Sequence, residues 1–271
     1  MLRATGNRLC ASPMGGDTCG YAPETFRRCS TDAAACIAAC SKALDPDAYS
    51  TPKHGFTHDG DVWSVAFSAD GRWIASGDLA SKLIVRDATS GEQKHCFTHD
   101  DAVWSVAFSA DGRWLASGDD AKKLIVRDAT SGEQKHCFTH DDPVNSVAFS
   151  ADGRWLASGD YAKKLIVRDA TSGEQKHYFT HDGNVRSVAF SADGRWLASG
   201  DSANKLIVRD ATSGEQKHCF THDDCVWSVA FSADGRWLAS GDLASKLIVR
   251  DATSGEQKHC FTHDGEVWSV A

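Results

Sequence analysis

Histidine and aspartate recur along this sequence at a fixed interval, and they are the side chains with the clearest capacity for chemistry. His58 is followed by Asp59, His95 comes later, and copies of both histidines return along the chain. Such groups can hold a metal ion only where they converge within about 2 to 2.6 Å of it. Equivalent residues of successive repeats lie on successive structural units, so we expect no metal site and no cofactor.

The same repetition argues against an active site. A catalytic centre brings unlike residues together, whereas near-identical units present the same residues again and again. The recurring Asp-Gly pairs are typical of turns more than of calcium ligands. We therefore predict that the protein is not an enzyme and has no catalytic residues.

The ten cysteines fall into two groups. In the repeated part, four share one place in the unit and one is additional; they are Cys96, Cys137, Cys219, Cys260 and, as the extra residue, Cys225. A disulfide needs Cα atoms within about 7 Å of each other, and equivalent positions on neighbouring units are further apart. We predict free thiols, which favour a reducing compartment such as the cytoplasm.

A Cys-rich segment, residues 1–49, precedes the repeats and holds the other cysteines: Cys10, Cys19, Cys29, Cys36 and Cys40. Thr31 can cap a short helix over 32–44 that ends before Pro46, so the segment is expected to be partly helical. Its cysteines could form a disulfide hairpin or bind zinc, although their number is odd and their spacing fits no familiar zinc pattern. A disordered leader is the alternative. Residues 1–16 carry two arginines and no acid, as a targeting peptide does, but no apolar core follows.

The rest of the chain is one unit of 41 residues, repeated with little change. The five complete copies and the partial sixth are 56–96, 97–137, 138–178, 179–219, 220–260 and 261–271. Within the first unit, runs rich in β-branched and aromatic residues occur at 62–68, 73–78, 83–86 and 93–98, separated by turn residues. Four antiparallel strands in about 40 residues are typical of a propeller blade. The sequence therefore predicts an all-β fold of four-stranded antiparallel blades.

Several stretches of the unit carry a resemblance to a known family. They are Thr57-His58, 65–71, 74–77 and 82–87. At these places the unit resembles the WD-repeat family, which has Gly-His at the first and ends the last in Trp-Asp. The resemblance covers about residues 50–271 and implies a β-propeller domain that binds a protein or peptide partner.

The unit departs from that family at its structural brace. The resemblance implies a hydrogen-bonded tetrad of His, Ser or Thr, Asp and Trp in each blade. His58 and Ser76 occupy the first two places, but Ala80 stands where the Asp belongs and Arg86 where the Trp belongs. This puts the usual brace in doubt. Because an unpaired buried charge costs several kcal/mol, we predict that Arg86 pairs with Asp78, which is also repeated.

The two ends of the repeated region do not complete a blade. Residues 50–57 match an outermost strand standing alone, and 267–271 match an innermost strand standing alone. The two middle strands of a blade lie between such strands, so these two cannot pair directly. We expect an incomplete or open ring, either the front part of a longer protein or an arc that self-associates through its open ends.

The complete copies are identical at 34 positions and differ at seven. One difference, Ile74 against leucine elsewhere, is a conservative core change. In an up-and-down meander the other six share one edge: the start of the first strand, the turn between the second and third strands, and the end of the fourth. The turns at the opposite edge do not change.

Variation at one edge favours a diversified partner-binding surface, as in the hypervariable WD-repeat arrays that this pattern resembles. Loop drift after recent duplication, on a structural scaffold or assembly subunit, is the alternative. Exposed Trp and Tyr are frequent binding hot spots. The candidate partner-binding residues are Asp61, Trp63, Leu79, Ala102, Trp104, Asp120, Pro143, Asn145, Tyr161, Asn184, Arg186, Ser202, Cys225, Trp227, Leu243, Glu266 and Trp268.

The formal net charge of the 271-residue chain is −8. A protein that tracks nucleic-acid phosphates normally presents a basic face, and an anionic membrane surface also attracts basic segments. The charge therefore argues against nucleic acid and membrane partners and favours a protein or peptide.

Overall fold

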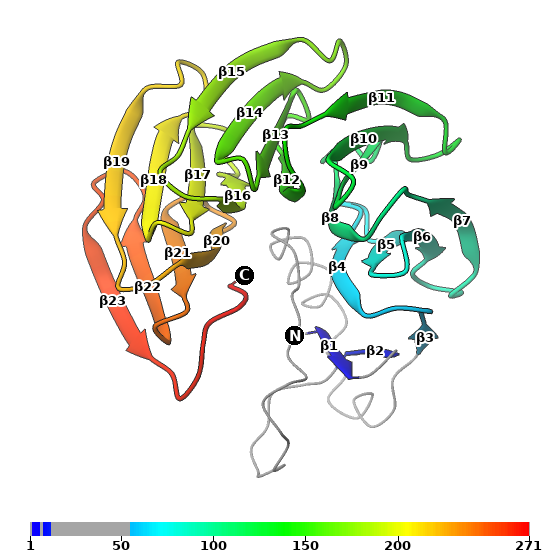
Figure 1. Cartoon of the computed structure of the whole chain (residues 1–271), viewed down its shortest axis with the longest axis horizontal. Coiled ribbons are helices and arrows are strands. Elements are labelled where there is room, and N and C mark those ends of the chain that lie inside the picture. Colours follow the sequence, from blue (N-terminus) through cyan, green and yellow to red (C-terminus); the bar gives the residue numbers. More distant parts are fainter. Residues whose placement is uncertain (1, 6–7, 12–54, 271) are drawn as a thin grey trace.

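The computed structural model describes residues 2–5, 8–11 and 55–270. Five four-stranded antiparallel sheets follow one another in a curve around a common centre (Figure 1). In each sheet the strands lie in chain order, with the first at the centre and the fourth at the circumference. We call these sheets blades 1 to 5. The predicted all-β fold of four-stranded blades is confirmed.

The strands have the same length and spacing in every blade because the repeated sequence is nearly the same. Blade 1 contains β4 (Val62–Phe67), β5 (Trp73–Asp78), β6 (Lys82–Asp87) and β7 (Gln93–Thr98). Blades 2 and 3 contain β8 (Val103–Phe108), β9 (Trp114–Asp119), β10 (Lys123–Asp128), β11 (Gln134–Thr139), β12 (Val144–Phe149), β13 (Trp155–Asp160), β14 (Lys164–Asp169) and β15 (Gln175–Thr180). Blades 4 and 5 contain β16 (Val185–Phe190), β17 (Trp196–Asp201), β18 (Lys205–Asp210), β19 (Gln216–Thr221), β20 (Val226–Phe231), β21 (Trp237–Asp242), β22 (Lys246–Asp251) and β23 (Gln257–Thr262).

A further three-stranded sheet precedes blade 1. It contains β1 (Leu2–Thr5), β2 (Arg8–Ala11) and β3 (Phe56–Thr57), in that order. β3 is therefore paired with β2, and the prediction that residues 50–57 form a lone outermost strand is wrong for this part. The physical reason is that an outermost strand leaves a row of backbone donors and acceptors open to pairing. The helix expected over 32–44 lies outside the described residues, as do four of the five N-terminal cysteines.

The last described residues run beside blade 5 without forming a strand. The backbone N–H of Val270 donates to Ser228 Oγ at 3.1 Å. The same bond joins neighbouring blades elsewhere, as between the N–H of Val106 and Ser64 Oγ at 2.9 Å. The segment thus follows the path of an innermost strand, as the sequence indicated, although no strand pairing is formed there.

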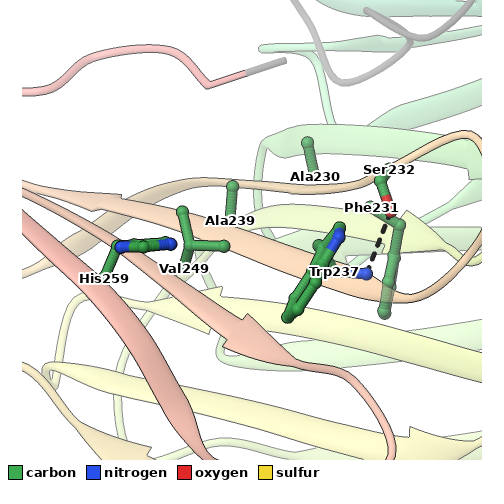
Figure 2. A pocket seen from close by; sticks show the side chains of 7 residues that line it. All are labelled: Ala230, Phe231, Ser232, Trp237, Ala239, Val249 and His259. Atoms are coloured by element: carbon green, nitrogen blue, oxygen red, sulfur yellow. Dashed lines mark hydrogen bonds between the residues drawn. The ribbon is translucent and has the colours of Figure 1, made fainter.

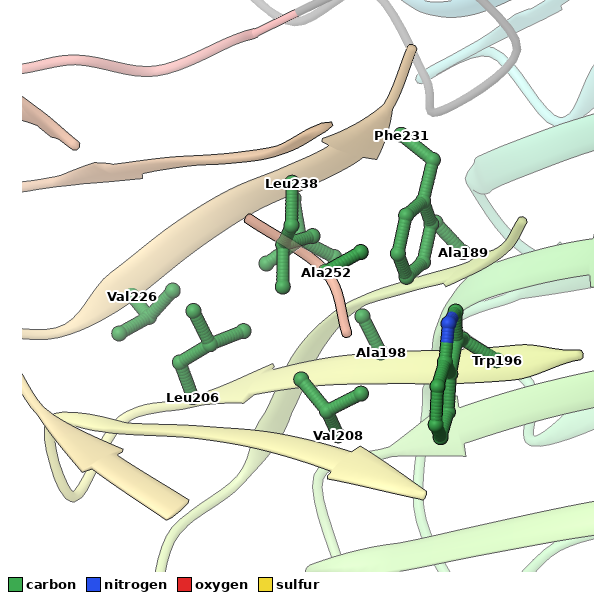
Figure 3. Close-up of a cluster of buried hydrophobic side chains, with 10 residues drawn as sticks. Ala189, Trp196, Ala198, Leu206, Val208, Val226, Phe231, Leu238 and Ala252 are labelled. Atoms are coloured by element: carbon green, nitrogen blue, oxygen red, sulfur yellow. The ribbon is translucent and has the colours of Figure 1, made fainter. Parts of the chain in front are cut away.

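Neighbouring blades share their hydrophobic cores. In the cluster between blades 4 and 5, side chains from the two sheets interdigitate (Figure 3). Its members are Ala189, Trp196, Ala198, Leu206, Val208, Val226, Val229, Phe231, Leu238 and Ala252. A glycine in each second strand allows this approach: a Cβ on Gly77 would lie 2.6 Å from Val103 Cγ1 of the next blade. Each blade is therefore held mainly by the next one.

Candidate functional site

A buried histidine joins the loop before each blade to the blade's second strand. His58 Nδ1 lies 2.8 Å from Asp78 Oδ2, and Ser76 Oγ lies 2.8 Å from His58 Nε2. Asp78 can only accept, so Nδ1 carries the proton and the Ser76 hydroxyl donates to Nε2. Neither the His58 nor the Asp78 side chain is exposed. We call this arrangement the His-Asp brace, and His99, His140, His181 and His222 repeat it.

Asp78 thus supplies the carboxylate that the sequence lacks at Ala80. The blade therefore does contain a hydrogen-bonded His, Ser and Asp brace. The predicted pairing of Arg86 with Asp78 is wrong. Asp78 is already occupied, because its second oxygen accepts the backbone N–H of Lys82 at 2.8 Å. This bond closes the turn between β5 and β6 from its inner side.

Arg86 instead lies against Phe56 of β3. Its guanidinium carbon is 4.8 Å from the centre of the Phe56 ring, and Nη1 donates to the Gly91 carbonyl at 3.5 Å. The four later copies stack in the same way on the phenylalanine of the blade before them, at 4.1 to 4.3 Å: Arg127 on Phe97, Arg168 on Phe138, Arg209 on Phe179 and Arg250 on Phe220. A cation over an aromatic face contributes about 0.5–2 kcal/mol. The arginine at the expected Trp position therefore ties each blade to its predecessor.

Burial disfavours the charged form of the brace imidazole in blade 5. Burial lowers the pKa of His222 from its ordinary value of 6.5, and this outweighs the hydrogen bond and charge of Asp242, which raise it. A neutral imidazole that donates to a carboxylate and accepts from a hydroxyl fits a structural role. Within residues 55–270, no three His, Cys, Asp or Glu side chains gather closely enough to hold a metal ion.

The innermost strand of each blade contains a β-bulge, and it lies at one of the variable positions. In blade 1, Val62 pairs with Asp78 and Ser64 with Gly77, so Trp63 has no residue opposite it. The bulge returns in the next four blades at Trp104, Asn145, Arg186 and Trp227. A bulge turns a side chain away from the regular pleat and is frequent beside functional sites. Sequence reasoning missed the bulge; its only signal was one changing residue inside an otherwise constant strand.

Two variable loops meet at the same edge of each blade. The backbone N–H of Leu79 donates to the Asp61 carbonyl at 2.9 Å. The same bond recurs at 2.9 to 3.2 Å in the other blades, from Asp120 to Ala102, Tyr161 to Pro143, Ser202 to Asn184, and Leu243 to Cys225. The residue at Ser81 has a φ of 63°, in the left-handed region, and its copies at Lys122, Lys163, Asn204 and Ser245 do too. The predicted shared edge is confirmed for these loop positions.

The sixth variable position lies elsewhere. Cys96 pairs with Ile84 in the middle of the outermost strand, and the same register places Cys137, Tyr178, Cys219 and Cys260. These side chains lie on the outer circumference, so assigning this position to the loop edge was wrong. The repeat cysteines are free thiols, as predicted; four are exposed and Cys225 is buried.

Trp63 and Trp104, from neighbouring innermost strands, form the first contact between variable side chains. Their ring centres are 4.6 Å apart with an interplanar angle of 68°, an edge-to-face arrangement. The indole N–H of Trp104 donates to Asp120 Oδ1 at 2.9 Å. Asp120 occupies the second variable loop of the same blade, so strand and loop positions form one group.

A second group surrounds Arg186. Its guanidinium carbon lies 4.6 Å from the Tyr161 ring centre and 4.7 Å from that of Trp227. Nη1 donates to the Tyr161 hydroxyl at 2.7 Å. Trp227 in turn meets Trp268 edge-to-face at 4.8 Å. Four predicted residues from successive blades are therefore in direct contact.

Three predicted residues expose little surface. Ala102 and Cys225 are each 6% exposed, and Asn145 is 3% exposed and donates to the Val185 carbonyl at 3.0 Å. Burial raises the pKa of the Cys225 thiol, which the charge of Arg186 opposes. The remaining candidates are half-buried or exposed: Asp61, Leu79, Pro143, Asn184, Ser202, Leu243 and Glu266.

An apolar pocket lies on blade 5, lined in part by Trp237, Val249 and His259 (Figure 2). The lining residues Ala239 and Val249 correspond to Ala75 and Val85 of blade 1, which are buried against blade 2. In blade 5 the described residues that pack on this side are Val267 and Val270, and Ala239 and Leu247 remain partly exposed.

The repeated four-stranded antiparallel sheets, each with a buried His-Asp brace, define a tandem-blade protein of the propeller type. The family described as "WD domain, G-beta repeat" matches residues 50–86, 91–128, 132–169, 173–208 and 214–250, and the chain belongs to this WD40 family. A comparison of the sequence with curated proteins found no match. Repeats of this family generally serve as protein-interaction modules and are typically non-enzymatic. Among the described residues no helix has the length and apolar character needed to cross a membrane.

Proposed function

We propose that this protein is an interaction module that presents a diversified recognition surface at the edge carrying the variable loops and bulges. The observation that carries the proposal is that variable side chains from different blades contact one another there. Trp63 meets Trp104 across blades 1 and 2, and Arg186 joins Tyr161 of blade 3 to Trp227 of blade 5.

The chemistry of these side chains supports the proposal over simple loop drift. Trp, Tyr and Arg are the residues most enriched at binding hot spots. The Trp and Arg side chains emerge at a bulge, the place in a strand where a side chain can be redirected without changing the sheet, and Tyr161 lies in the adjacent variable loop. The turns at the opposite edge, such as 68–71 and 87–91, are identical in all complete copies. Random sequence change after duplication would be expected to alter both sets of turns.

The test is recovery of protein partners from native lysate by the purified chain. The double variant Trp104→Ala and Trp227→Ala removes one aromatic side chain from each contact group. The matched control, Arg113→Ala and Arg236→Ala, changes the same two blades at the opposite turns, where each arginine stacks on the adjacent tryptophan at 4.5 Å. We expect loss of partners from the double variant alone, with both variants folded by circular dichroism. Equal recovery by all three proteins would refute the proposal.

The second candidate function is a structural scaffold or assembly subunit that associates through its open ends. The observation in its favour is the partly exposed apolar side of blade 5, where Phe261 is 49% exposed. Exposed apolar patches and strand edges promote association. Sedimentation velocity over a hundredfold range of concentration tests it. A mass that stays at the monomer value throughout counts against this candidate.

A further inference from the structure

The group formed by Trp63, Trp104 and Asp120 has the composition of a site for a cation. Trp104 lies edge-to-face against Trp63, a geometry that does not take up both faces of both rings. The carboxylate of Asp120 is held at the edge of Trp104 by the indole N–H, which occupies only one of its oxygens. An aromatic face next to a carboxylate attracts a cation through both the ring quadrupole and the charge.

The loops around this group hold an excess of acid. Asp100, Asp101 and Asp120 form no ion pair with any residue of the described chain. Two lysines that follow the variable turns of blades 1 and 2 are engaged elsewhere: Lys82 Nζ donates to Thr98 and Lys123 Nζ to Thr139. On the loops after blade 2, by contrast, Asp142 pairs with Lys122 and Asp141 with Lys164. Asp100, Asp101 and Asp120 are therefore carboxylates that no cation among the described residues neutralises.

The group around Arg186 indicates the kind of cation that aromatic side chains at this edge can hold. At the equivalent bulge of blade 4 the chain places Arg186, whose guanidinium stacks on both Tyr161 and Trp227 and donates to the tyrosine hydroxyl. No cation of the described residues lies over Trp104. A guanidinium can also stack its flat face on an indole while one N–H donates to the remaining oxygen of Asp120, a combination that suits arginine better than the compact ammonium of lysine.

We propose that the surface of Trp104, Trp63 and Asp120 binds an arginine side chain of a protein partner. The inference rests on the proposed function and names the chemistry of the partner. The guanidinium lies over the Trp104 ring and donates to the free oxygen of Asp120. The net charge of −8 on the whole chain also favours a basic partner and faster association at low ionic strength.

The experiment follows the indole N–H signals of the ¹⁵N-tryptophan-labelled full chain by NMR. The probe is the peptide acetyl-Gly-Gly-Arg-Gly-Gly-amide, and its control contains citrulline, which has nearly the same shape without the charge. Trp104→Phe and Trp227→Phe assign the two relevant signals. We expect the arginine peptide to shift the Trp104 signal and the citrulline peptide to need about tenfold more for the same shift. Added salt should weaken the binding.

Asp120→Ser separates binding from folding, because blade 4 already carries Ser202 at the equivalent position. We expect this variant to keep its folded spectrum and lose about threefold or more in affinity for the arginine peptide. The matched control is Tyr161→Ser, the same change on blade 3, which should leave binding at Trp104 unchanged.

Equal shifts with arginine and citrulline, or a Trp227 signal that moves while Trp104 does not, would overturn the inference. Failure here is distinct from failure of the proposed function. If Trp104→Ala and Trp227→Ala abolish partner recovery while the arginine peptide leaves Trp104 unmoved, the surface binds protein but not through arginine. If recovery is unchanged by those substitutions, the proposed function itself fails.

Discussion

The His-Asp brace predicts a large and local stability effect in blade 3. Asp160 is fully buried and accepts two hydrogen bonds: from His140 Nδ1 at 2.9 Å and from the backbone N–H of Lys164 at 2.8 Å. Asp160→Ala removes both acceptors and leaves one buried donor, His140 Nδ1, and one partly buried donor, the Lys164 N–H, without this partner. A hydrogen bond to a charged group contributes about 1.5–3 kcal/mol, and an unsatisfied buried group costs a similar amount. We expect Asp160→Ala to lower the free energy of unfolding by about 3–5 kcal/mol.

Asp160→Asn separates the charge from the shape. The amide oxygen can still accept from Lys164, while its NH₂ group faces His140 Nδ1. The imidazole can adapt by moving its proton to Nε2, which then donates to Ser158 Oγ, now at 3.1 Å. Two bonds are kept and only their charge assistance is lost, so we expect a cost of about 1–2 kcal/mol.

The measurement is urea unfolding followed by tryptophan fluorescence and circular dichroism, with the slope m compared between variants. Asp201→Ala, the same change in blade 4, should cost nearly as much, because its His181 bond is also 2.9 Å. Glu174→Ala, on an exposed turn, is the control and should stay within about 0.5 kcal/mol of the parent. An Asp160→Ala protein as stable as this control would refute the role assigned to the brace.

Three further predictions concern the core, the contact between blades and pH. Leu206→Ala removes a fully buried side chain from the cluster between blades 4 and 5 and should lower the unfolding free energy by about 2–5 kcal/mol in urea. Gly200→Ala places a Cβ 2.6 Å from Val226 Cγ1 and should cost about 1–3 kcal/mol, whereas Gly55→Ala, with nothing within 4 Å, should cost little. The lowered pKa of His222 means that below pH 6.5 the unfolded chain binds a proton that the folded chain does not. Stability should therefore fall on acidification below that pH, by up to about 1.4 kcal/mol per pH unit for this one group. His222→Gln should remove this part of the slope, and an unchanged slope would contradict the assignment. The exposed turn carboxylates, such as Asp251 with its lowered pKa, lose their contribution only near and below their ordinary value of 3.8, so their loss begins at a lower pH than that of His222.

The strands were predictable because hydrophobic period and turn chemistry act locally. The run 62–68 was placed within one residue of β4, which ends at Phe67. It ends there because Ser68 leaves the sheet, its hydroxyl donating to Asp70 Oδ1 at 2.6 Å. The contact across blades between Ser64 and Val106, 42 residues apart, leaves no such local signal.

The brace was mispredicted for an instructive reason. Matching residue by residue to the family placed Ala80 where the carboxylate belongs, and Asp78 was left to pair with Arg86. The structure shows that a carboxylate two residues earlier reaches the same histidine. Position in a motif is a poor guide where a short loop can bring either of two nearby residues to the same atom. Arg86 lies without a carboxylate: its guanidinium stacks on Phe56 and Nη1 donates to the Gly91 carbonyl, while its buried Nε has no hydrogen-bond partner among the described residues.

The candidate site was predicted as an edge, but its internal contacts were not. The meander alone places the strand start beside the turn between the second and third strands, and the bond from Leu79 to the Asp61 carbonyl confirms that part. Which side chains then touch depends on the bulge and on the angle between blades, neither of which a period in sequence encodes. The stacking of Arg186 on Trp227 could therefore not be predicted from the sequence and is seen only in the structure.

The His-Asp brace lies next to the variable loops and anchors their ends. The brace residues are therefore constant, while the side chains of the loops can change. His58 immediately precedes the first variable loop, and Asp78 immediately precedes the second. Asp78 binds both His58 and the backbone N–H of Lys82, so it fixes the two ends of the second loop and one end of the first. The loop side chains themselves take no part in these bonds. Substitutions at Leu79 and its copies should then change what the surface contacts with little effect on stability, within about 0.5 kcal/mol. The variant Leu243→Asp, which gives blade 5 the residue that blade 2 has at Asp120, tests this by urea unfolding. If Leu243→Asp lowered the free energy of unfolding as much as Asp160→Ala does, the variable loop and the His-Asp brace would not be independent.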